Sequence, residues 1–290
     1  MKTGIVILNY NSADLVINLC KEICNYDSLD YICVVDNCSP NDDYNKLKLS
    51  LEKNKKIYIY KSEKNNGYAQ GNNFGISKLI EIDSTIDVIY ICNPDVLFKE
   101  DVILSVNNFM QMNKTVGACS CAVTDIEGNF THRQTWNIPT EWQEIKASLL
   151  IPKLLNKRKN VNKINSDTKV EVIPGSFFAL NRVVINKNIS FDENTFLYYE
   201  ENILFKKLKE NGYGAYILAE PQYIHNHPYS SNEPISKKMK AYKIYLKSKR
   251  YFFNNYLTNN KILMFIHSSF TIYDSITHRL SLCIKKILKK

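Results

Sequence analysis

The sequence predicts an α/β fold with a mostly parallel sheet flanked by helices and followed by a basic helical extension. In the first half, short apolar or β-branched runs alternate with helical segments, which is typical of βαβ units. Polar clusters follow several of these runs directly, where open α/β sheets bind their ligands. The 290 residues, 44% of them hydrophobic, suit one large folded domain with an appendage.

The expected elements of the first half alternate regularly. Strands are predicted at 5–8, 32–35, 57–60 and 88–92, and helices at 14–26, 42–54 and 69–82. Right-handed crossovers between parallel strands would bring the loops that follow each strand to one edge of the sheet.

The second half is less regular. Strands are predicted at 117–123, 170–180 and 213–218, a loop at 151–168, and helices at 199–211, 237–256 and 262–290. Gly212 is a natural stop for the helix before it. We expect a catalytic domain over residues 1–230 and a basic amphipathic helical tail over residues 231–290.

The positive charge is concentrated in the tail. Residues 231–290 carry 13 Lys and Arg and 2 Asp and Glu, a net charge of +11 in a chain whose total is +9, so residues 1–230 carry −2. This asymmetry indicates an anionic partner for the tail, although a solvated helix face would have the same composition. The near-neutral body and the lack of a zinc or helix-turn-helix pattern argue against nucleic acid.

The cysteines and the apolar runs indicate a reducing, intracellular setting. None of the eight cysteines forms a C-x-x-C pair, and Cys33 and Cys92 lie in apolar runs, where a free thiol packs as a small hydrophobe. We see no signal peptide and no run of 18 apolar residues. A cytoplasmic protein is therefore expected.

Polar motifs follow the first two predicted strands. Asn9 and Asn11 come after the first strand, and Asp36 and Asn37 after the second. These side chains could bind a nucleoside base and ribose. They could equally cap loops, because Asn and Asp readily bond to their own backbone.

A glycine- and asparagine-rich segment opens the third predicted helix. It contains Asn66, Gly67 and Asn73, and glycines recur every four residues from Gly67 to Gly75. Glycines at a helix start allow a ligand to approach the backbone closely. The same spacing also suits tight packing of a helix on the sheet.

Carboxylates occur at two further points. Asp95 ends the fourth strand in Asn93-Pro94-Asp95, where an oxygen ligand could hold Mg²⁺ or Mn²⁺, although this could be a simple turn. Glu200 and Glu201 begin a predicted helix, where acids complement the helix dipole or act as general bases.

In their order along the chain, these segments resemble glycosyltransferase family 2, especially its rhamnosyltransferase-like members. The matching segments, within residues 3–235, are VILNYNS, VVDNCS, NNGYAQGNNFGI, ICNPDVLF, VIPGSFFAL, TFLYYEE and HNHPYS. The resemblance implies a GT-A fold, with a Rossmann-like sheet, that binds a nucleoside-diphosphate sugar. It assigns nucleotide contacts to Asn9, Asn11, Asp36, Asn37, Asn66, Gly67, Asn73 and Asn93.

The resemblance also implies the reacting groups. Asp95 matches the second acid of the family's metal-binding D-x-D, with Asn93 in place of the first, and His225 matches a residue that completes the metal site. Pro174, Gly175 and Ser176 match a segment on the acceptor side. Glu201 matches the general base, an Asp in the family, and Glu200 remains an alternative because Ile203 replaces the acid commonly found nearby.

The function implied is a metal-assisted, inverting transfer of a sugar to a hydroxyl of a cell-surface glycan precursor of O-antigen or capsule type. Rhamnose from a thymidine diphosphate donor follows from the resemblance, while uridine and guanosine donors stay open. A catalytically degenerate homologue that binds nucleotide sugar or membrane is the alternative. A sugar nucleotidyltransferase is disfavoured, because no Gly-rich, basic phosphate loop follows the first strand.

The tail is expected to dock peripherally on the inner face of the cell membrane, where a lipid-linked glycan acceptor would lie. Apolar groups alternate with Lys in three stretches, 251–253, 262–265 and 284–288, as in interfacial helices. The alternative is that these apolar groups pack on the catalytic domain.

Overall fold

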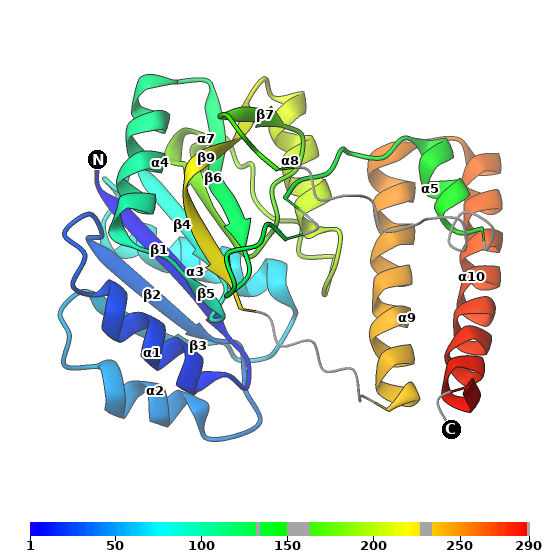
Figure 1. Cartoon of the computed structure of the whole chain (residues 1–290), viewed down its shortest axis with the longest axis horizontal. Coiled ribbons are helices and arrows are strands. Elements are labelled where there is room, and N and C mark those ends of the chain that lie inside the picture. The colour runs from blue at the N-terminus through cyan, green and yellow to red at the C-terminus, as the bar shows by residue number, and fades with distance from the viewer. Residues whose placement is uncertain (132–133, 150–162, 227–233, 289–290) are drawn as a thin grey trace.

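The computed structural model describes residues 1–131, 134–149, 163–226 and 234–288. Within these residues, nine strands form one sheet with the order β3-β2-β1-β4-β8-β6-β9-β5, and β7 pairs with β9. Helices cover both faces of the sheet, and a C-terminal helical hairpin stands to one side of it (Figure 1). The strands are β1 (Thr3–Asn9), β2 (Tyr31–Asp36), β3 (Ile57–Lys61), β4 (Val88–Cys92), β5 (Val96–Leu97), β6 (Val116–Thr124), β7 (Thr168–Val170), β8 (Phe177–Asn181) and β9 (Gly214–His225). The helices are α1 (Ala13–Ile23), α2 (Asp43–Leu51), α3 (Tyr68–Ile82), α4 (Glu100–Met112), α5 (Glu141–Ala147), α7 (Arg182–Asn186), α8 (Glu200–Glu210), α9 (Ile235–Phe252), the π-helix η1 (Phe253–Leu257) and α10 (Lys261–Leu288).

The predicted α/β class is confirmed, and the sheet is mixed. Strands β3, β2, β1 and β4 are parallel to one another, as the first half of the sequence predicts. In contrast, β8 runs antiparallel to both β4 and β6, and β9 pairs antiparallel with β5 and β7 but parallel with β6. The parallel half brings the ends of β1, β2 and β4 to one edge, where Asn9 pairs in register with Asp36.

The prediction of one strand over 170–180 is wrong. That stretch contains the end of β7 and most of β8, with a turn that includes Gly175 between them. Pro174 precedes this turn and has no amide hydrogen to donate to a sheet ladder, so a continuous central strand is disfavoured there. The interruption lets the Gly175 and Ser176 carbonyls accept hydrogen bonds from Tyr68 and Asn93 instead of from a neighbouring strand.

Helix α4 is a second difference from the prediction, because no element was expected there. Val102, Val106 and Met110 recur at helical spacing and are fully buried, which is a signal the sequence does contain. The boundary predicted between residues 230 and 231, and most of the loop predicted at 151–168, lie outside the described residues.

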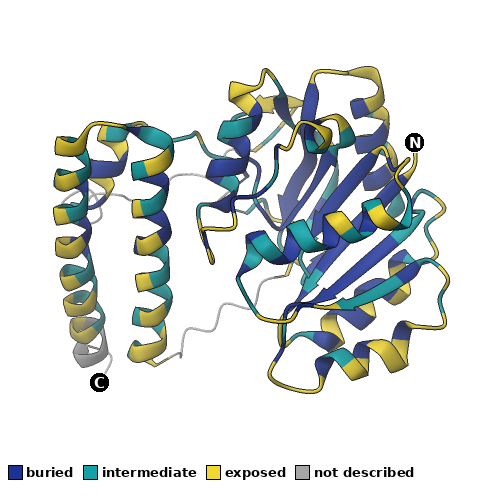
Figure 2. Cartoon of the chain, turned by 180° about the vertical axis from the view of Figure 1, so that it is seen from behind, coloured by how far each residue is buried: buried dark blue, intermediate teal, exposed yellow. Residues whose placement is uncertain are grey.

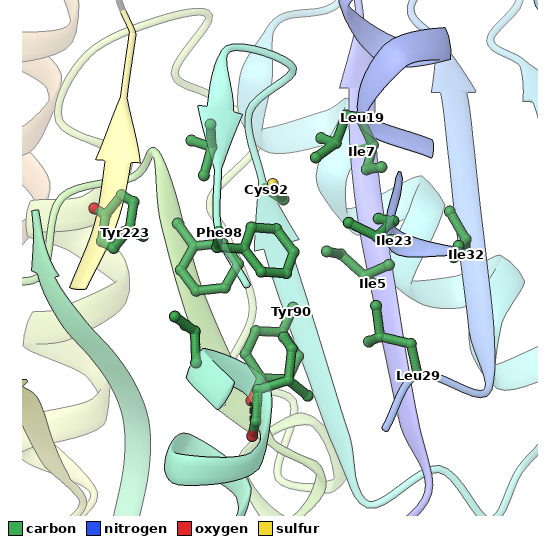
Figure 3. Packing of buried hydrophobic residues seen from close by; sticks show 14 of the residues in the cluster. Ile5, Ile7, Leu19, Ile23, Leu29, Ile32, Tyr90, Cys92, Phe98 and Tyr223 are labelled. Carbon is green, nitrogen blue, oxygen red and sulfur yellow. Dashed lines mark hydrogen bonds between the residues drawn. The ribbon is translucent and has the colours of Figure 1, made fainter. Parts of the chain in front are cut away.

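Two hydrophobic cores sandwich the sheet. One lies under α1, α2 and α4 and contains Ile5, Leu19 and Tyr90 (Figure 3). The other lies under α3, α7 and α8 on the opposite face. All eight cysteines are free and five of them are buried, which agrees with their interpretation as small core residues.

The C-terminal helices form a hairpin in which α10 packs against α9. Figure 2 shows exposed residues along the outer sides of both helices. The expectation of an exposed apolar stretch at 251–253 is wrong for Phe252 and Phe253, which are 0% exposed because they pack inside the protein. Ile262 and Phe265, in contrast, are 71% and 74% exposed.

Candidate active site

The motifs predicted from the sequence meet at the carboxyl edge of the parallel strands. Backbone bonds join them in pairs: the Asn37 amide donates to the Asn9 carbonyl, and the Asn93 amide donates to the Ser176 carbonyl, both at 2.8 Å. The Tyr68 hydroxyl donates to the Gly175 carbonyl at 2.5 Å. Segments that are far apart in the sequence therefore form one continuous site.

The ends of β1 and β2 are joined by a buried polar cluster. The side-chain amide of Asn9 donates to Asp36 Oδ1 at 2.8 Å and to Asp43 Oδ2 at 3.0 Å. All three side chains are buried, and Asp43 also accepts from the Ala13 amide at the start of α1. Asn9 therefore holds two carboxylates at the sheet edge, while exposed Asn11 lies on the outside of the same loop.

Asn37 links the second strand to the Gly67 loop. Its side-chain amide donates to Asn65 Oδ1 and to the Gly67 carbonyl, both at 3.1 Å. Asn37 Oδ1 is buried, and no hydrogen-bond partner for it lies among the described residues. A buried acceptor of this kind at a sheet edge is a ready partner for a donor group of a ligand. Asn66, in the same loop, is half-buried.

Gly67 allows this loop to touch the segment before the two glutamates. Its φ is +100°, and a Cβ there would lie 2.0 Å from the Phe196 carbonyl oxygen. The next amide, that of Tyr68, donates to the same carbonyl at 2.9 Å. Glycine is required at this position by both conformation and space.

Asn73 makes its contacts with a different segment. It lies in α3, and its amide donates to the Phe191 carbonyl at 3.0 Å and to Glu193 Oε1 at 2.9 Å. These bonds tie α3 to the chain before α8, so Asn73 orients the loop leading to the candidate bases.

Asp95 and His225 come together as expected for ligands of one metal ion. His225 Nε2 lies 3.3 Å from Asp95 Oδ1, and the pairing of β5 with β9 sets this distance. Two cis ligands of an octahedral Mg²⁺, each about 2.1 Å from the ion, lie about 3.0 Å apart. The pair therefore fits a divalent cation. No cluster of three or more His, Cys, Asp or Glu residues suited to a metal occurs in the described part of the chain. Asn93 is half-buried two residues before Asp95.

The turn before β8 faces the candidate bases. A Cβ on Gly175 would lie 2.4 Å from Glu201 Oε1, so the Glu201 carboxylate packs directly on this glycine. The hydroxyls of Ser176 and Tyr223 are 2.9 Å apart and buried. Gly175, predicted on the acceptor side, thus contacts the predicted base.

The two glutamates have different environments. Glu200 is 2% exposed, whereas Glu201 is half-buried. Burial, and then repulsion from Glu201, raise the pKa of Glu200 to about 8. No hydrogen-bond partner for Glu200 Oε1 lies among the described residues. Burial and the neighbouring carboxylate therefore favour the protonated form of Glu200, while half-buried Glu201 faces Gly175.

The backbone before these acids is strained. Tyr198 and Tyr199 have φ values of 74° and 70°, in the left-handed region that bulky residues avoid. Tyr199 is the N-cap of α8 and makes no side-chain cap bond. Consecutive strained residues persist only where their surroundings fix them, and they cluster at functional sites.

Sequence reasoning missed several residues of this site. Asp43 was expected only as part of a helix start, although an acid there can reach the sheet edge. Tyr68 lay inside a recognised motif, but its bond to Gly175 is not visible in the sequence. Glu144 of α5 and Lys249 of α9, discussed below, gave no local signal.

A separate cavity of about 540 Å³ lies between β7, β9 and the C-terminal half of α8. Its lining includes Lys169, Glu171 and Lys209, and it contains none of the residues predicted for the site. Lys209 and Glu171 form an ion pair at 2.5 Å. We assign this cavity no part in the chemistry.

Comparisons with known proteins agree with the motifs. The model of glycosyl transferase family 2 matches residues 4–189. No match was found among curated proteins.

Several solved structures share the fold. The mannosyltransferase PcManGT from Pyrobaculum calidifontis, in complex with GDP-Man and Mn²⁺, has 13% identity and a TM-score of 0.58, over 98% of this chain and 75% of its own. GalNAc-T7 with UDP, GalNAc and Mn²⁺ has 12% identity and a TM-score of 0.59, over 93% and 55%. TarS 1-349 of S. aureus has 12% identity and a TM-score of 0.54, over 88% and 66%. The chain thus spans less than two thirds of the length of the last two proteins.

Proposed function

Because the chain belongs to glycosyl transferase family 2, we propose that it moves a sugar from a nucleoside diphosphate to a hydroxyl group with inversion at the anomeric carbon. Family membership confirms the class of enzyme predicted from the motifs. The observation that carries the proposal is that Glu201 packs on the Gly175 turn, while the Tyr68 amide beside Gly67 bonds to the Phe196 carbonyl shortly before both acids. We further propose a cell-surface glycan precursor as acceptor and rhamnose as one candidate sugar.

The two acids have different roles in the reaction. Glu201 accepts the proton of the acceptor hydroxyl as that oxygen bonds to the anomeric carbon, and the bond from this carbon to the diphosphate oxygen breaks. Glu200, whose protonated form is favoured by burial, keeps a second negative charge away from Glu201. General base catalysis of this kind contributes about 10²- to 10⁴-fold in rate.

The nucleoside would lie at the ends of β1 and β2. Asn37 offers its buried Oδ1 acceptor there, beside the Asp36 carboxylate that Asn9 fixes. We place Asn66 and Gly67, in the loop before α3, beside the nucleoside. Asn11, after β1, and Asn93, after β4, would lie at the borders of the same site. PcManGT was solved with GDP-Man and TarS 1-349 with UDP-GlcNAc. Sugars linked to guanosine and uridine diphosphate are therefore donors to test, together with the thymidine diphosphate sugar that the motifs suggest.

A divalent cation would be held by Asp95 and His225 together with diphosphate oxygens. Bound there, Mg²⁺ or Mn²⁺ would neutralise charge on the departing nucleoside diphosphate. PcManGT and GalNAc-T7 contain Mn²⁺ in their structures, which supports a metal-assisted reaction. Asn93, in place of an acid, leaves this site with one fewer negative charge.

Asn93 favours the second candidate, a degenerate homologue that binds a nucleotide sugar without transferring the sugar. Asn93 weakens the attraction for a cation, and Glu201 replaces an expected aspartate. The two candidates differ in turnover and not in binding, so a binding assay and a rate assay on one preparation separate them.

The test of donor binding is a thermal-shift panel of thymidine, uridine and guanosine diphosphates, with and without Mn²⁺. A ligand that binds only the folded state raises its stability, by about 2.7 kcal/mol at a hundredfold excess over Kd. A metal-dependent shift with one nucleotide supports the proposal, and Asp95→Ala should abolish the metal dependence. No shift with any nucleotide would remove its basis.

The tail supports a location at the inner face of an anionic membrane. Five exposed basic residues of α9 recur every three or four positions, and exposed apolar residues of α10 recur at spacings of three, four and seven, which keep them on one face of the helix. The basic stripe consists of Lys237, Lys240, Lys243, Lys247 and Arg250. The apolar stripe consists of Ile262, Phe265, Ile272, Ile276, Leu280 and Ile284. Among the described helices, none is long and apolar enough to cross a bilayer. Exposed basic and apolar stripes of this kind suit peripheral binding through charge and burial.

Flotation with vesicles tests this location. Phe265→Ser/Ile276→Ser should reduce flotation with anionic vesicles, and Leu104→Ser/Met112→Ser, which removes exposed apolar groups of α4, should not. Equal flotation of all three proteins would contradict membrane docking by α10.

A further inference from the structure

We infer that Tyr199, Glu144 and Lys249 form a positioning network through which the C-terminal hairpin holds the strained turn that presents Glu200 and Glu201. The inference rests on the proposed function and deepens it, because it assigns the hairpin a role in catalysis. Neither the motifs nor the family match assigns a role in the reaction to any of these three residues.

The first link joins the turn to α5. The Tyr199 hydroxyl lies 3.0 Å and 3.1 Å from the two oxygens of Glu144 and donates to that carboxylate. Glu144 is buried at the N-terminal end of α5, whose start is fixed by a capping box at Thr140. The N-cap residue of α8, which has no cap bond of its own, is thus anchored through its side chain.

The second link joins α5 to the hairpin. Lys249 of α9 is 1% exposed, and its ammonium group lies 3.4 Å from Glu144 Oε2 and donates to Ser148 Oγ at 2.8 Å. A buried lysine is costly unless it is paired. Its position beside Glu144 balances the buried carboxylate that accepts from Tyr199.

Aromatic and backbone contacts complete the attachment. The Tyr199 ring packs on Phe252 and Tyr245 with ring centroids 5.3 Å and 5.7 Å apart. The Ser248 hydroxyl of α9 donates to the Leu197 carbonyl at 2.8 Å. The C-terminal half of α9 therefore contacts Leu197, Tyr198 and Tyr199, immediately before the acids.

This attachment explains how the strain is maintained. Two left-handed tyrosines cost about 1–3 kcal/mol each, and a relaxed turn would rotate the first turn of α8. Glu200 would then reach water, and Glu201 would leave Gly175. The network opposes that relaxation, so its loss should affect the acids while the nucleotide edge, built on β1, β2 and α3, stays intact.

The test compares Tyr199→Phe with a matched variant, Tyr251→Phe. Tyr251 lies on α9 and donates its hydroxyl to Asp192 Oδ2 at 2.9 Å, outside the 196–199 turn. Both tyrosines are half-buried, and each variant loses one hydrogen-bonded hydroxyl and keeps the ring. We expect kcat to fall about 10- to 100-fold in Tyr199→Phe only, with donor Kd unchanged in both.

Two further readouts distinguish positioning from general destabilisation. The pH–rate limb that reports Glu200 should move to lower pH in Tyr199→Phe, because hydration lowers the pKa of a carboxyl group now raised by burial and by Glu201. Half-buried Tyr68 of α3 also faces this pair among the described residues, and burial followed by the two glutamates raises its pKa well above its usual value. Hydrogen exchange of the amides at 198–203 should be faster in Tyr199→Phe than in Tyr251→Phe.

The outcomes separate this inference from the proposed function. Equal kcat, pH profile and amide exchange in the two variants would overturn the positioning role. If wild-type protein turns over no donor, the proposed function fails, and faster exchange confined to 198–203 of Tyr199→Phe would still support the network.

Discussion

Replacing Gly67 with alanine tests whether the nucleotide loop is locked onto the segment that precedes the catalytic acids. A Cβ there would lie 2.0 Å from the Phe196 carbonyl oxygen and 2.6 Å from its carbonyl carbon and Cα. These are backbone atoms, so they cannot move aside as a flexible side chain would. The residue would also keep φ at +100° with ψ at −174°, a region essentially confined to glycine, which costs an alanine about 1–3 kcal/mol.

The magnitude follows from the two contributions. Overpacking a well-packed site costs about 1–3 kcal/mol, so Gly67→Ala should lower the free energy of unfolding by about 2–6 kcal/mol in total. Gly128→Ala is the matched control, because its φ is +81° and a Cβ there meets nothing within 4 Å. The control should cost only the conformational part, about 1–2 kcal/mol.

Urea unfolding of wild type, Gly67→Ala and Gly128→Ala measures the loss of unfolding free energy in each variant. If the denaturant slope is the same in all three, the midpoints give these losses directly. Nucleotide affinity, measured by calorimetry on the folded variants, should fall for Gly67→Ala and stay at the wild-type value for Gly128→Ala. If Gly67→Ala costs no more stability than Gly128→Ala, then the two loops are not in contact and the site described here is wrong.

Three other changes have expected results. Glu201→Gln should lower kcat at least about 10²-fold with donor affinity kept, as measured by steady-state kinetics and calorimetry; near-full turnover would refute its role as base. Since the folded pKa of Glu200 is raised to about 8 from 4.5, its stabilising contribution is present below pH 4.5 and is lost as pH rises through 8. Glu200→Gln should therefore gain stability relative to wild type between those values in urea titrations, and a constant difference would contradict the raised pKa. Lys249→Met should cost about 3–5 kcal/mol because it leaves Glu144 buried without its cation, and a cost under about 1 kcal/mol in the same assay would show that the pair is not buried as described.

The sequence predicts the parallel half of the fold well because its signals are local. The apolar runs of β1, β2 and β4 are flanked by polar loops, and each helix between them has its own periodicity. The order beyond β4 depends on pairings between distant segments, so the split around Pro174 and the antiparallel course of β8 could not be predicted from local pattern.

The same distinction holds for the site. The motif residues Asn9, Asp36 and Asp95 could be predicted because each follows a strand whose end lies at a known edge. The network of Tyr199, Glu144 and Lys249 could not be predicted. These residues come into contact only when α5 and α9 pack against the turn before α8. Strain at Tyr199 is likewise invisible in the sequence, since nothing in a Tyr-Tyr pair predicts a left-handed backbone.

Release of nucleoside diphosphate from a panel of sugar nucleotides with Mn²⁺ shows whether the protein transfers a sugar with Glu201 as its base. Wild-type protein and Glu201→Gln are compared on thymidine, uridine and guanosine diphosphate sugars, with a glycan acceptor present. Wild type should release the nucleoside diphosphate from one donor class, and the variant should bind this donor but release the nucleoside diphosphate at least about 10²-fold more slowly. Binding of a donor by wild type without release from any sugar nucleotide, or equal release by both proteins, would contradict this mechanism.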